Sequence, residues 1–215
     1  MNAFLALVAR DVRLAYGRGG VALPIVFFLL VATLYPFGVG PDGPLLAKTG
    51  GGVLWIAALL AALLPIDRLF APDMDQGVLD QLAIRGISDE SVALAKFAGH
   101  WVGFGPPLML AAIPAAALLR LEGDTLARLE LGLLLGTPGL AALAVLIAAI
   151  TAGLRGAGAL AGLLMLPLAV PLLIFGAGSL DPLGGSALKL LAASSMLAIA
   201  VTPFAAGAAI RASRE

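Results

Sequence analysis

Few side chains in this 215-residue sequence could carry out chemistry. There is no cysteine, so disulfides and thiolate chemistry are excluded, and there is one histidine, His100. Without a clustered Ser/His/Asp set or a set of metal ligands, we expect neither an enzyme nor a metal site. The net charge is zero, which gives no basic field for nucleic acid. Acidic residues are concentrated in one segment, residues 67–96, which holds six of the thirteen: Asp67, Asp73, Asp75, Asp80, Asp89 and Glu90.

The acidic segment 67–96 is predicted to form two short helices. The first covers residues 75–84, with Asp73 or Asp75 as its N-cap and with Gly86 following its last turn. The second begins at Ser88 and continues into the next apolar stretch. Such a segment is either a solvated connector or a docking surface for a cytoplasmic partner. If it docks a partner, the candidate contact residues are Asp73, Asp75, Gly77, Val78, Leu79, Asp80, Gln81, Leu82 and Arg85.

The rest of the chain has the composition of a membrane protein. It is 61% hydrophobic and only 12% charged, against about 25% charged residues in soluble domains. A bilayer core about 30 Å thick needs roughly 20 apolar residues per helix. Because lipid offers no partners for backbone groups, stretches of this length must be helical. We therefore expect one all-α transmembrane domain over residues 1–215, with six spans at residues 21–39, 50–66, 97–119, 131–154, 157–180 and 190–210.

Lysine and arginine predict the orientation of these spans. Six spans place both termini on one side of the membrane, and that side holds nine cations: Arg10, Arg13, Arg18, Arg68, Arg85, Lys96, Arg155, Arg211 and Arg214. The other side holds four, which are Lys48, Arg120, Arg128 and Lys189. The richer side should be cytoplasmic. Aromatic residues are expected at the two interfaces, with Tyr16 and Trp101 at the inner one and Tyr35 and Trp55 near the outer one.

Two further local features are visible. Residues 1–19 are too polar to span, and on a helical wheel Phe4 and Val8 lie roughly opposite Arg10 and Arg13. This pattern predicts an amphipathic helix lying on the cytoplasmic membrane surface. The alternative is a positively charged segment beside the first span that forms no stable helix.

In the fifth span, Pro167 and Pro171 are four residues apart, which predicts either a kink or a break.

The order of several motifs resembles a known family. The run Asp73-x-Asp75-x-Gly77-x-Leu79-Asp80-Gln81-Leu82 resembles the coupling segment of type-2 ABC exporter permeases. Three more stretches resemble the heme exporter protein B (CcmB) family: Phe27-Phe-Leu-Leu-Val-Ala-Thr-Leu-Tyr-Pro-Phe-Gly-Val-Gly-Pro41, Leu94-Ala-Lys-Phe-Ala-Gly-His-Trp101 and Leu166-Pro-Leu-Ala-Val-Pro-Leu-Leu-Ile-Phe175. The resemblance covers nearly the whole chain. Asp80 stands where the family has Glu, and Pro72 and Met74 displace the first acid of the preceding pair.

The resemblance implies a permease subunit of the bacterial inner membrane that serves cytochrome c maturation. Its implied partners are a CcmA-like ATPase, a CcmC-like heme-handling protein, a small CcmD-like subunit and a CcmE-like heme chaperone. ATP hydrolysis by the ATPase would drive heme export or release of the loaded chaperone at the periplasmic face. The sequence itself has no G-x-x-x-x-G-K-[S/T] motif to bind the phosphates of ATP. This agrees with an ATPase in another chain. Six spans also imply a homodimer or a paired permease.

Heme is the cofactor that the resemblance suggests, as a transported or neighbouring ligand. His100, beside Trp101, could supply one axial ligand. Alternatively, His100 is a boundary residue that hydrogen-bonds backbone or a lipid headgroup. Two other functions also remain open, which are a structural scaffold for the heme-handling complex and a generic ABC-2-type lipid or polysaccharide exporter permease.

Overall fold

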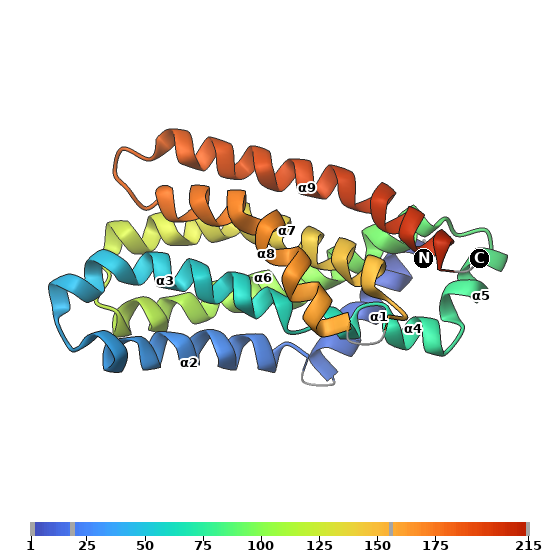
Figure 1. Ribbon diagram of the computed structural model, residues 1–215, viewed down its shortest axis with the longest axis horizontal. Coiled ribbons are helices and arrows are strands. Elements are labelled where there is room, and N and C mark those ends of the chain that lie inside the picture. Colours follow the sequence, from blue (N-terminus) through green and yellow to red (C-terminus); the bar gives the residue numbers. More distant parts are fainter. Residues whose placement is uncertain (1–2, 18–19, 155–156, 214–215) are drawn as a thin grey trace.

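The computed structural model describes residues 3–17, 20–154 and 157–213, and within these ranges it contains helices and no strand (Figure 1). Three cations counted above, Arg18, Arg155 and Arg214, lie outside the described residues. Six helices are long and apolar enough to cross a membrane. They are α2 (Ala22–Val39), α3 (Gly43–Leu63), α6 (Asp89–Leu118), α7 (Gly123–Thr151), α8 (Ala157–Gly178) and α9 (Gly185–Ala212). The prediction of an all-α protein with six spans is confirmed.

The six long helices run along the long axis of the molecule (Figure 1). The short connections 40–42, 119–122 and 179–184 lie at one end of the bundle. The segment between α3 and α6 lies at the other end, together with α1 (Ala3–Gly17) and the last turns of α9. We call this second end the terminal end.

Four helices begin well before the apolar stretches expected from the sequence. α3 begins at Gly43 rather than residue 50, because Pro44 opens its first turn and the Asp42 carboxylate accepts a hydrogen bond from Leu45 N. α7 and α9 likewise begin eight and five residues early, whereas the early start of α6 at Asp89 agrees with the helix predicted from Ser88. The sequence prediction ended spans at charged side chains, whereas a helix can continue past the lipid into water, where it carries residues such as Lys48 and Arg128.

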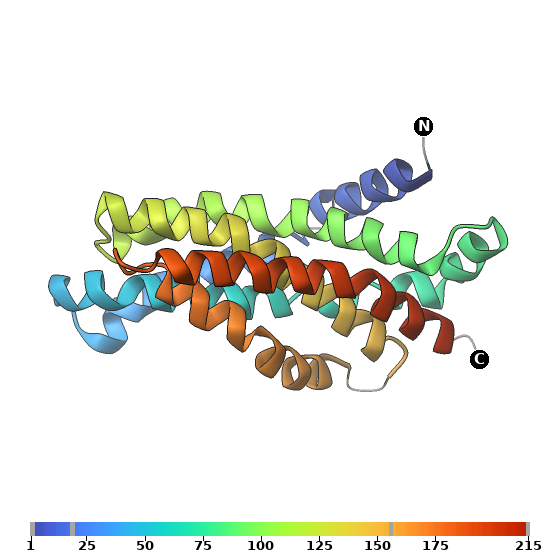
Figure 2. The same ribbon diagram turned by 90° about the horizontal axis from the view of Figure 1, so that it is seen from above.

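The proline pair in the fifth span does not break it. α8 is one continuous helix that contains both Pro167 and Pro171. Figure 2 shows its ribbon changing direction along its length, as expected where proline removes a backbone donor. The kink, not the break, is therefore the correct reading of this pattern.

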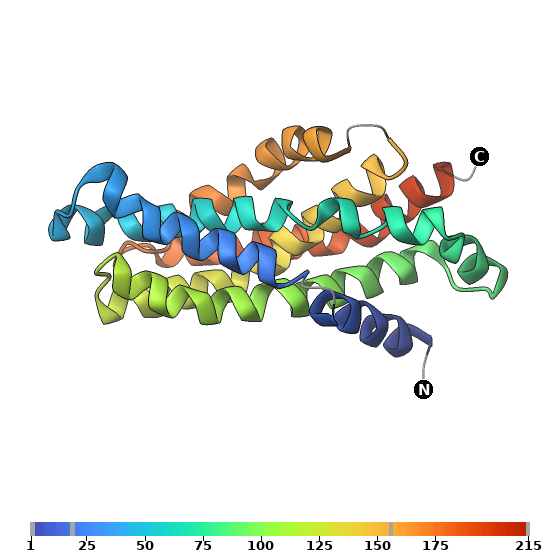
Figure 3. The same cartoon turned by 90° about the horizontal axis from the view of Figure 1, so that it is seen from below.

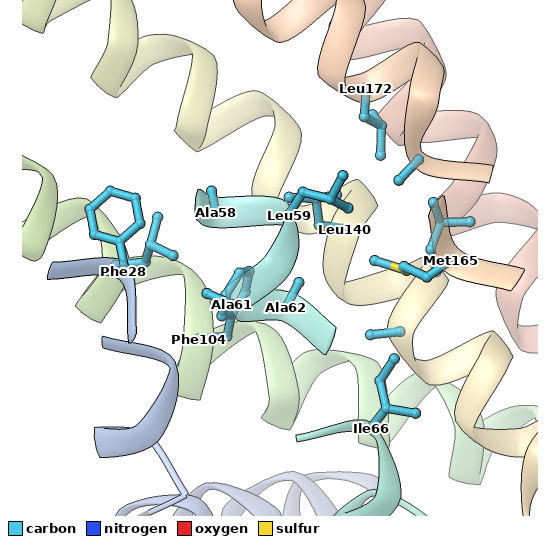
Figure 4. Packing of buried hydrophobic residues seen from close by; sticks show 14 of the residues in the cluster. Phe28, Ala58, Leu59, Ala61, Ala62, Ile66, Phe104, Leu140, Met165 and Leu172 are labelled. Carbon is cyan, nitrogen blue, oxygen red and sulfur yellow. The ribbon is translucent and has the colours of Figure 1, made fainter. Parts of the chain in front are cut away.

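The centre of the bundle is packed through small residues. α7 is the most enclosed span and packs against α6, α8 and α9. Side chains of α2, α3, α6, α7 and α8 meet in one apolar cluster (Figure 4). Trp55 of α3 is 1% exposed, so its ring packs between helices instead of facing lipid, and its depth near the outer interface stays a prediction. A Cβ added at Gly136 or Gly176 would approach the Trp55 ring to 2.6 Å, so glycine is what lets this ring enter the bundle.

Candidate functional site

Three short helices leave the bundle between α3 and α6. They are η1 (Ile66–Arg68), α4 (Ala71–Asp75) and α5 (Val78–Ile84), and they lie at the terminal end (Figure 1). The expected single helix over residues 75–84 is therefore wrong, because Gly77 has a φ of +64° and separates α4 from α5. Neither Asp73 nor Asp75 caps α5, since its N-cap is Gly77 without a side-chain hydrogen bond.

α5 presents one buried face and one exposed face. Leu79 is 3% exposed and Leu82 packs against the apolar cluster, whereas Val78 is half-buried. Gln81 and Ile84 are exposed, Ile84 at 86%. Ile84 was not in the predicted contact set, whose exposed members are Asp75, Asp80, Gln81 and Arg85. Arg85 is the C-cap and Gly86 has a φ of +75°, so α5 ends where the sequence predicted.

Asp73 is drawn inward by two cations from other helices. Its Oδ2 accepts a hydrogen bond from Arg10 Nη2 of α1 at 2.6 Å and forms an ion pair with Lys96 Nζ of α6 at 2.5 Å. Asp11 of α1 completes the group, with Arg10 at 2.9 Å and Lys96 at 3.5 Å. We call these four residues the ion cluster. It links α1, α4 and α6 with two positive and two negative charges.

The ion cluster is largely removed from water. Asp73 and Lys96 are 8% and 6% exposed. Burial lowers the pKa of Arg10, but the Asp11 and Asp73 carboxylates outweigh this effect and raise its pKa above the ordinary value. Removing one member of such a group leaves a buried charge without its partner, which costs far more than the net contribution of the intact group. α4 therefore cannot move independently of α1 and α6 without breaking these pairs.

The N-terminal helix packs on the bundle rather than only on a membrane surface. α1 lies alongside α6 (Figure 3), and a Cβ at Gly99 would approach Asp11 Cβ to 2.9 Å. Arg10 and Arg13 were expected on one polar face of this helix. Arg10 instead belongs to the ion cluster, and of the two only Arg13 is exposed. Phe4 and Val8 are half-buried, and the one fully buried residue of α1 is Leu7.

A second contact between charges joins α6 to α9 at the terminal end. Ser88 is the N-cap of α6, as the sequence predicted, with its hydroxyl accepting from Ser91 N. Arg211 Nη1 donates to Glu90 Oε1 at 2.5 Å and lies 4.0 Å from Asp89 Oδ2. The two helices approach closely at Gly207, because this residue has no side chain. A Cβ there would lie 3.1 Å from Glu90 N.

His100 and Trp101 point to different places. Trp101 Nε1 donates to Thr137 Oγ1 of α7 at 3.2 Å. His100 is buried at 8% exposure, stacks on Phe104 with ring centres 5.8 Å apart, and lies in the wall of a cavity of about 320 Å³. Its Nε2 has no hydrogen-bond partner among the described residues, so the expected bond to backbone is not found for that nitrogen. Within the same ranges, no group of three or more His, Cys, Asp or Glu could hold a metal ion.

Sequence reasoning missed the role of Asp11 and Lys96. Lys96 was counted only as one inner cation, and Asp11 was given no role. The available signal was that Asp11 is the one acidic residue in a segment whose other charged residues are arginines. A buried acid in such a segment needs a cation as its partner. Its partner on α6 could not be found, since the pairing depends on how α1 is placed.

The fold and the tethered loop define a multi-pass helical membrane protein with a charged segment at one end. The CcmB protein family matches residues 2–213. Heme exporter protein B of Rhodobacter capsulatus is 48% identical over 213 residues, which cover 96% of this chain and 97% of that protein. The proteins of the same name from Haemophilus influenzae and Escherichia coli K12 are 42% and 38% identical, over 99% and 97% of both chains. The chain belongs to the CcmB family, which confirms the resemblance.

Proposed function

We propose that this chain is the permease subunit of an ABC-type complex for cytochrome c maturation, and that α4 and α5 couple it to a CcmA-like ATPase. The observation that supports this proposal best is the buried ion cluster, which ties α4 to two other helices of the bundle. A loop that merely connects α3 to α6 would not need to bury Asp73 against Lys96, because burying charged groups costs free energy.

α5 supplies the surface for the ATPase in this proposal. Ile84 is 86% exposed on a helix outside the six spans, where water rather than lipid would surround it. An exposed isoleucine between the polar Gln81 and Arg85 suits the apolar centre and polar rim of a protein interface. Leu79 on the opposite face anchors α5 to the core, so force applied at Ile84 would reach the bundle.

A movement of the ATPase would pass from α5 through Gly77 to α4. From α4 it would pass through Asp73 to α1 and α6. Coupling requires that the ATPase contact α5 differently in its nucleotide-bound and free states. Movement of α4 would then shift Arg10 and Lys96 together, because both pair with the same Asp73 oxygen. α6 is also held at its first turn by Arg211, so a shift there would reach α9.

Heme is the proposed cargo or neighbouring ligand, since the similar proteins are named heme exporters. The complex would include CcmC-like, CcmD-like and CcmE-like proteins, with a homodimer or a paired permease in the inner membrane and the terminal end in the cytoplasm. ATP hydrolysis would drive heme export or release of the loaded chaperone at the periplasmic face. His100 stays a proposed heme contact, and Trp101 is a weaker candidate because its Nε1 bonds to Thr137 instead.

The test compares two aspartate substitutions at exposed apolar residues. Ile84→Asp alters α5, whereas Leu183→Asp alters a residue that is 92% exposed at the opposite end of the bundle. We expect Ile84→Asp to lose co-purification of the ATPase and ATP-dependent release of the heme-loaded chaperone. Leu183→Asp should keep the ATPase bound. Equal ATPase recovery with both variants would contradict docking at α5.

A further inference from the structure

Ion pairs join two sides of the cavity beside His100. The cavity is lined by residues of α1, α6, the start of α2 and the segment from η1 to α4. Three members of the ion cluster, Asp11, Asp73 and Lys96, belong to this wall. In the same wall, Nε2 of His100 is buried without a hydrogen-bond partner among the described residues. The ion pairs of Asp73 therefore join the α4 side of the cavity to the sides that α1 and α6 supply.

The α1 side of the cavity is held by close approach of two helices. α1 lies alongside α6 (Figure 3), and a Cβ at Gly99 would lie 2.9 Å from Asp11 Cβ. A Cβ at Gly103 would lie 3.1 Å from Ala15 Cβ. These contacts do not depend on charge, because they arise from the absence of a side chain on α6. We therefore expect α1 to stay on α6 even when the ion pairs are broken.

The α4 side of the cavity is held mainly by charge. Asp73 is the only fully buried residue of α4, and this helix packs mainly against η1 and α5 rather than against α1 or α6. If Asp73 withdraws, Lys96 Nζ still lies 3.5 Å from Asp11 Oδ2 and 5.7 Å from the centre of the Phe70 ring. Arg10 likewise keeps its pair with Asp11 at 2.9 Å. Neither cation is left alone, which lowers the free energy needed to part α4 from the other two helices.

We propose that α4 is a lid of this cavity and that Asp73 is the latch that holds it closed. The structure shows the closed state, in which Asp73 pairs with Arg10 and Lys96. A small movement of α4 carries α1 and α6 with it, whereas a larger movement separates Asp73 from both cations and opens the wall toward His100. The force that opens the lid rests on the proposed function, because α4 follows α5 through Gly77. The state of the ATPase then decides when a ligand, heme in that function, can reach His100.

The experiment measures access to the cavity with an introduced thiol, which is specific because the chain has no cysteine. His100→Cys places the thiol in the wall, and a charged methanethiosulfonate that does not cross membranes labels it in the full chain in lipid nanodiscs. The rate of labelling follows the population of the open state. Adding Asp73→Asn, which keeps the size of the side chain, should raise this rate about tenfold, as loss of one charge-assisted hydrogen bond predicts. An unchanged rate would overturn the proposal.

A matched thiol separates opening of the lid from loosening of the whole fold. Ala144→Cys lies in α7 at a residue that is 0% exposed and outside the cavity wall. Its labelling should stay slow when Asp73→Asn is added, and an equal rise at both thiols would overturn the lid. Arg10→Gln is a second latch variant, which leaves the pair between Asp73 and Lys96 in place and covers the case in which Asp73→Asn does not fold. It should raise the labelling of His100→Cys by a smaller factor and leave Ala144→Cys slow.

These measurements use the chain without its partners, so they do not depend on ATPase docking at α5. A final measurement adds the ATPase and nucleotide to His100→Cys with Asp73 intact, where labelling should change between the nucleotide-bound and free states. If labelling responds to Asp73→Asn but not to the ATPase, the lid stands and the coupling proposed for α5 is contradicted.

Discussion

The surroundings of Trp55 and the ion cluster hold helices together by opposite means. Around Trp55, glycines of α7 and α8 let backbones approach an indole that is 1% exposed. In the ion cluster, α1, α4 and α6 are joined through side chains that carry full charges. Lipid is as apolar as leucine, so close packing is the means available at membrane depth. At the terminal end charges can be used, and they give a link that depends on specific partners.

This difference has consequences for movement. A close-packed contact resists any shift, because each displaced atom loses dispersion contacts. An ion cluster can exchange partners among discrete arrangements, since Arg10 already pairs with both Asp11 and Asp73. We therefore expect the Trp55 region to be rigid and the ion cluster to be the region where conformations differ.

The largest effect is expected from breaking the ion cluster. Asp73→Ala leaves two cations for one carboxylate and should destabilise the protein by about 3–5 kcal/mol. Adding Lys96→Met restores equal charges and should recover most of that loss. Unfolding in mixed detergent, titrated with dodecyl sulfate, measures both variants. If the double variant is less stable than Asp73→Ala, the charges of the cluster do not act as a group.

A somewhat smaller effect is expected at the Trp55 contact. Gly176→Ala places a Cβ 2.6 Å from the ring, and overpacking of this kind costs about 1–3 kcal/mol. Gly162→Ala on the same helix is the control, because nothing lies within 4 Å of its added Cβ. The same unfolding measurement applies. Trp55→Phe should rescue Gly176→Ala, because it removes part of the colliding ring and an Nε1 that finds no hydrogen-bond partner in the described part of the chain.

A third prediction concerns the joint between α4 and α5. Gly77→Ala forces a side chain into a left-handed conformation and should cost about 1–2 kcal/mol. The stability loss is modest, but the angle between α4 and α5 should change, so ATP hydrolysis should continue with reduced release of the heme-loaded chaperone. Gly52→Ala, within α3 and with open space around it, is the control. Unchanged release by Gly77→Ala would separate the α4–α5 joint from coupling.

The smallest effect is expected at the α6–α9 contact. Arg211 is half exposed, so its pairing with Glu90 competes with water and is screened by salt. Arg211→Gln should lower the unfolding temperature less than the preceding variants, and the difference from the unaltered protein should shrink at high salt. A large loss that persists at high salt would show that this contact resembles the ion cluster rather than a surface pair.

The sequence predicted the parts of the site better than their arrangement. The ends of α5 at Arg85 and of α6 at Ser88 could be read from cap residues, which act locally. The division at Gly77 was missed, because glycine inside a short helix gives no sign of its φ. Asp73 was assigned to a cap for the same reason, since a nearby backbone was the only partner that a linear reading could offer.

By itself the sequence determined the membrane class, the six spans and the family, because hydropathy over about 20 residues and the order of motifs are local properties. The tertiary structure decided which charges meet. Lys96 is 23 residues from Asp73 in sequence and Arg10 is 63 residues away, yet all three lie within hydrogen-bonding or ion-pairing distance. It also decided that Trp55 is enclosed and that His100 faces a cavity. These outcomes depend on how helices pack side by side, and no single stretch of sequence specifies its neighbour across the bundle.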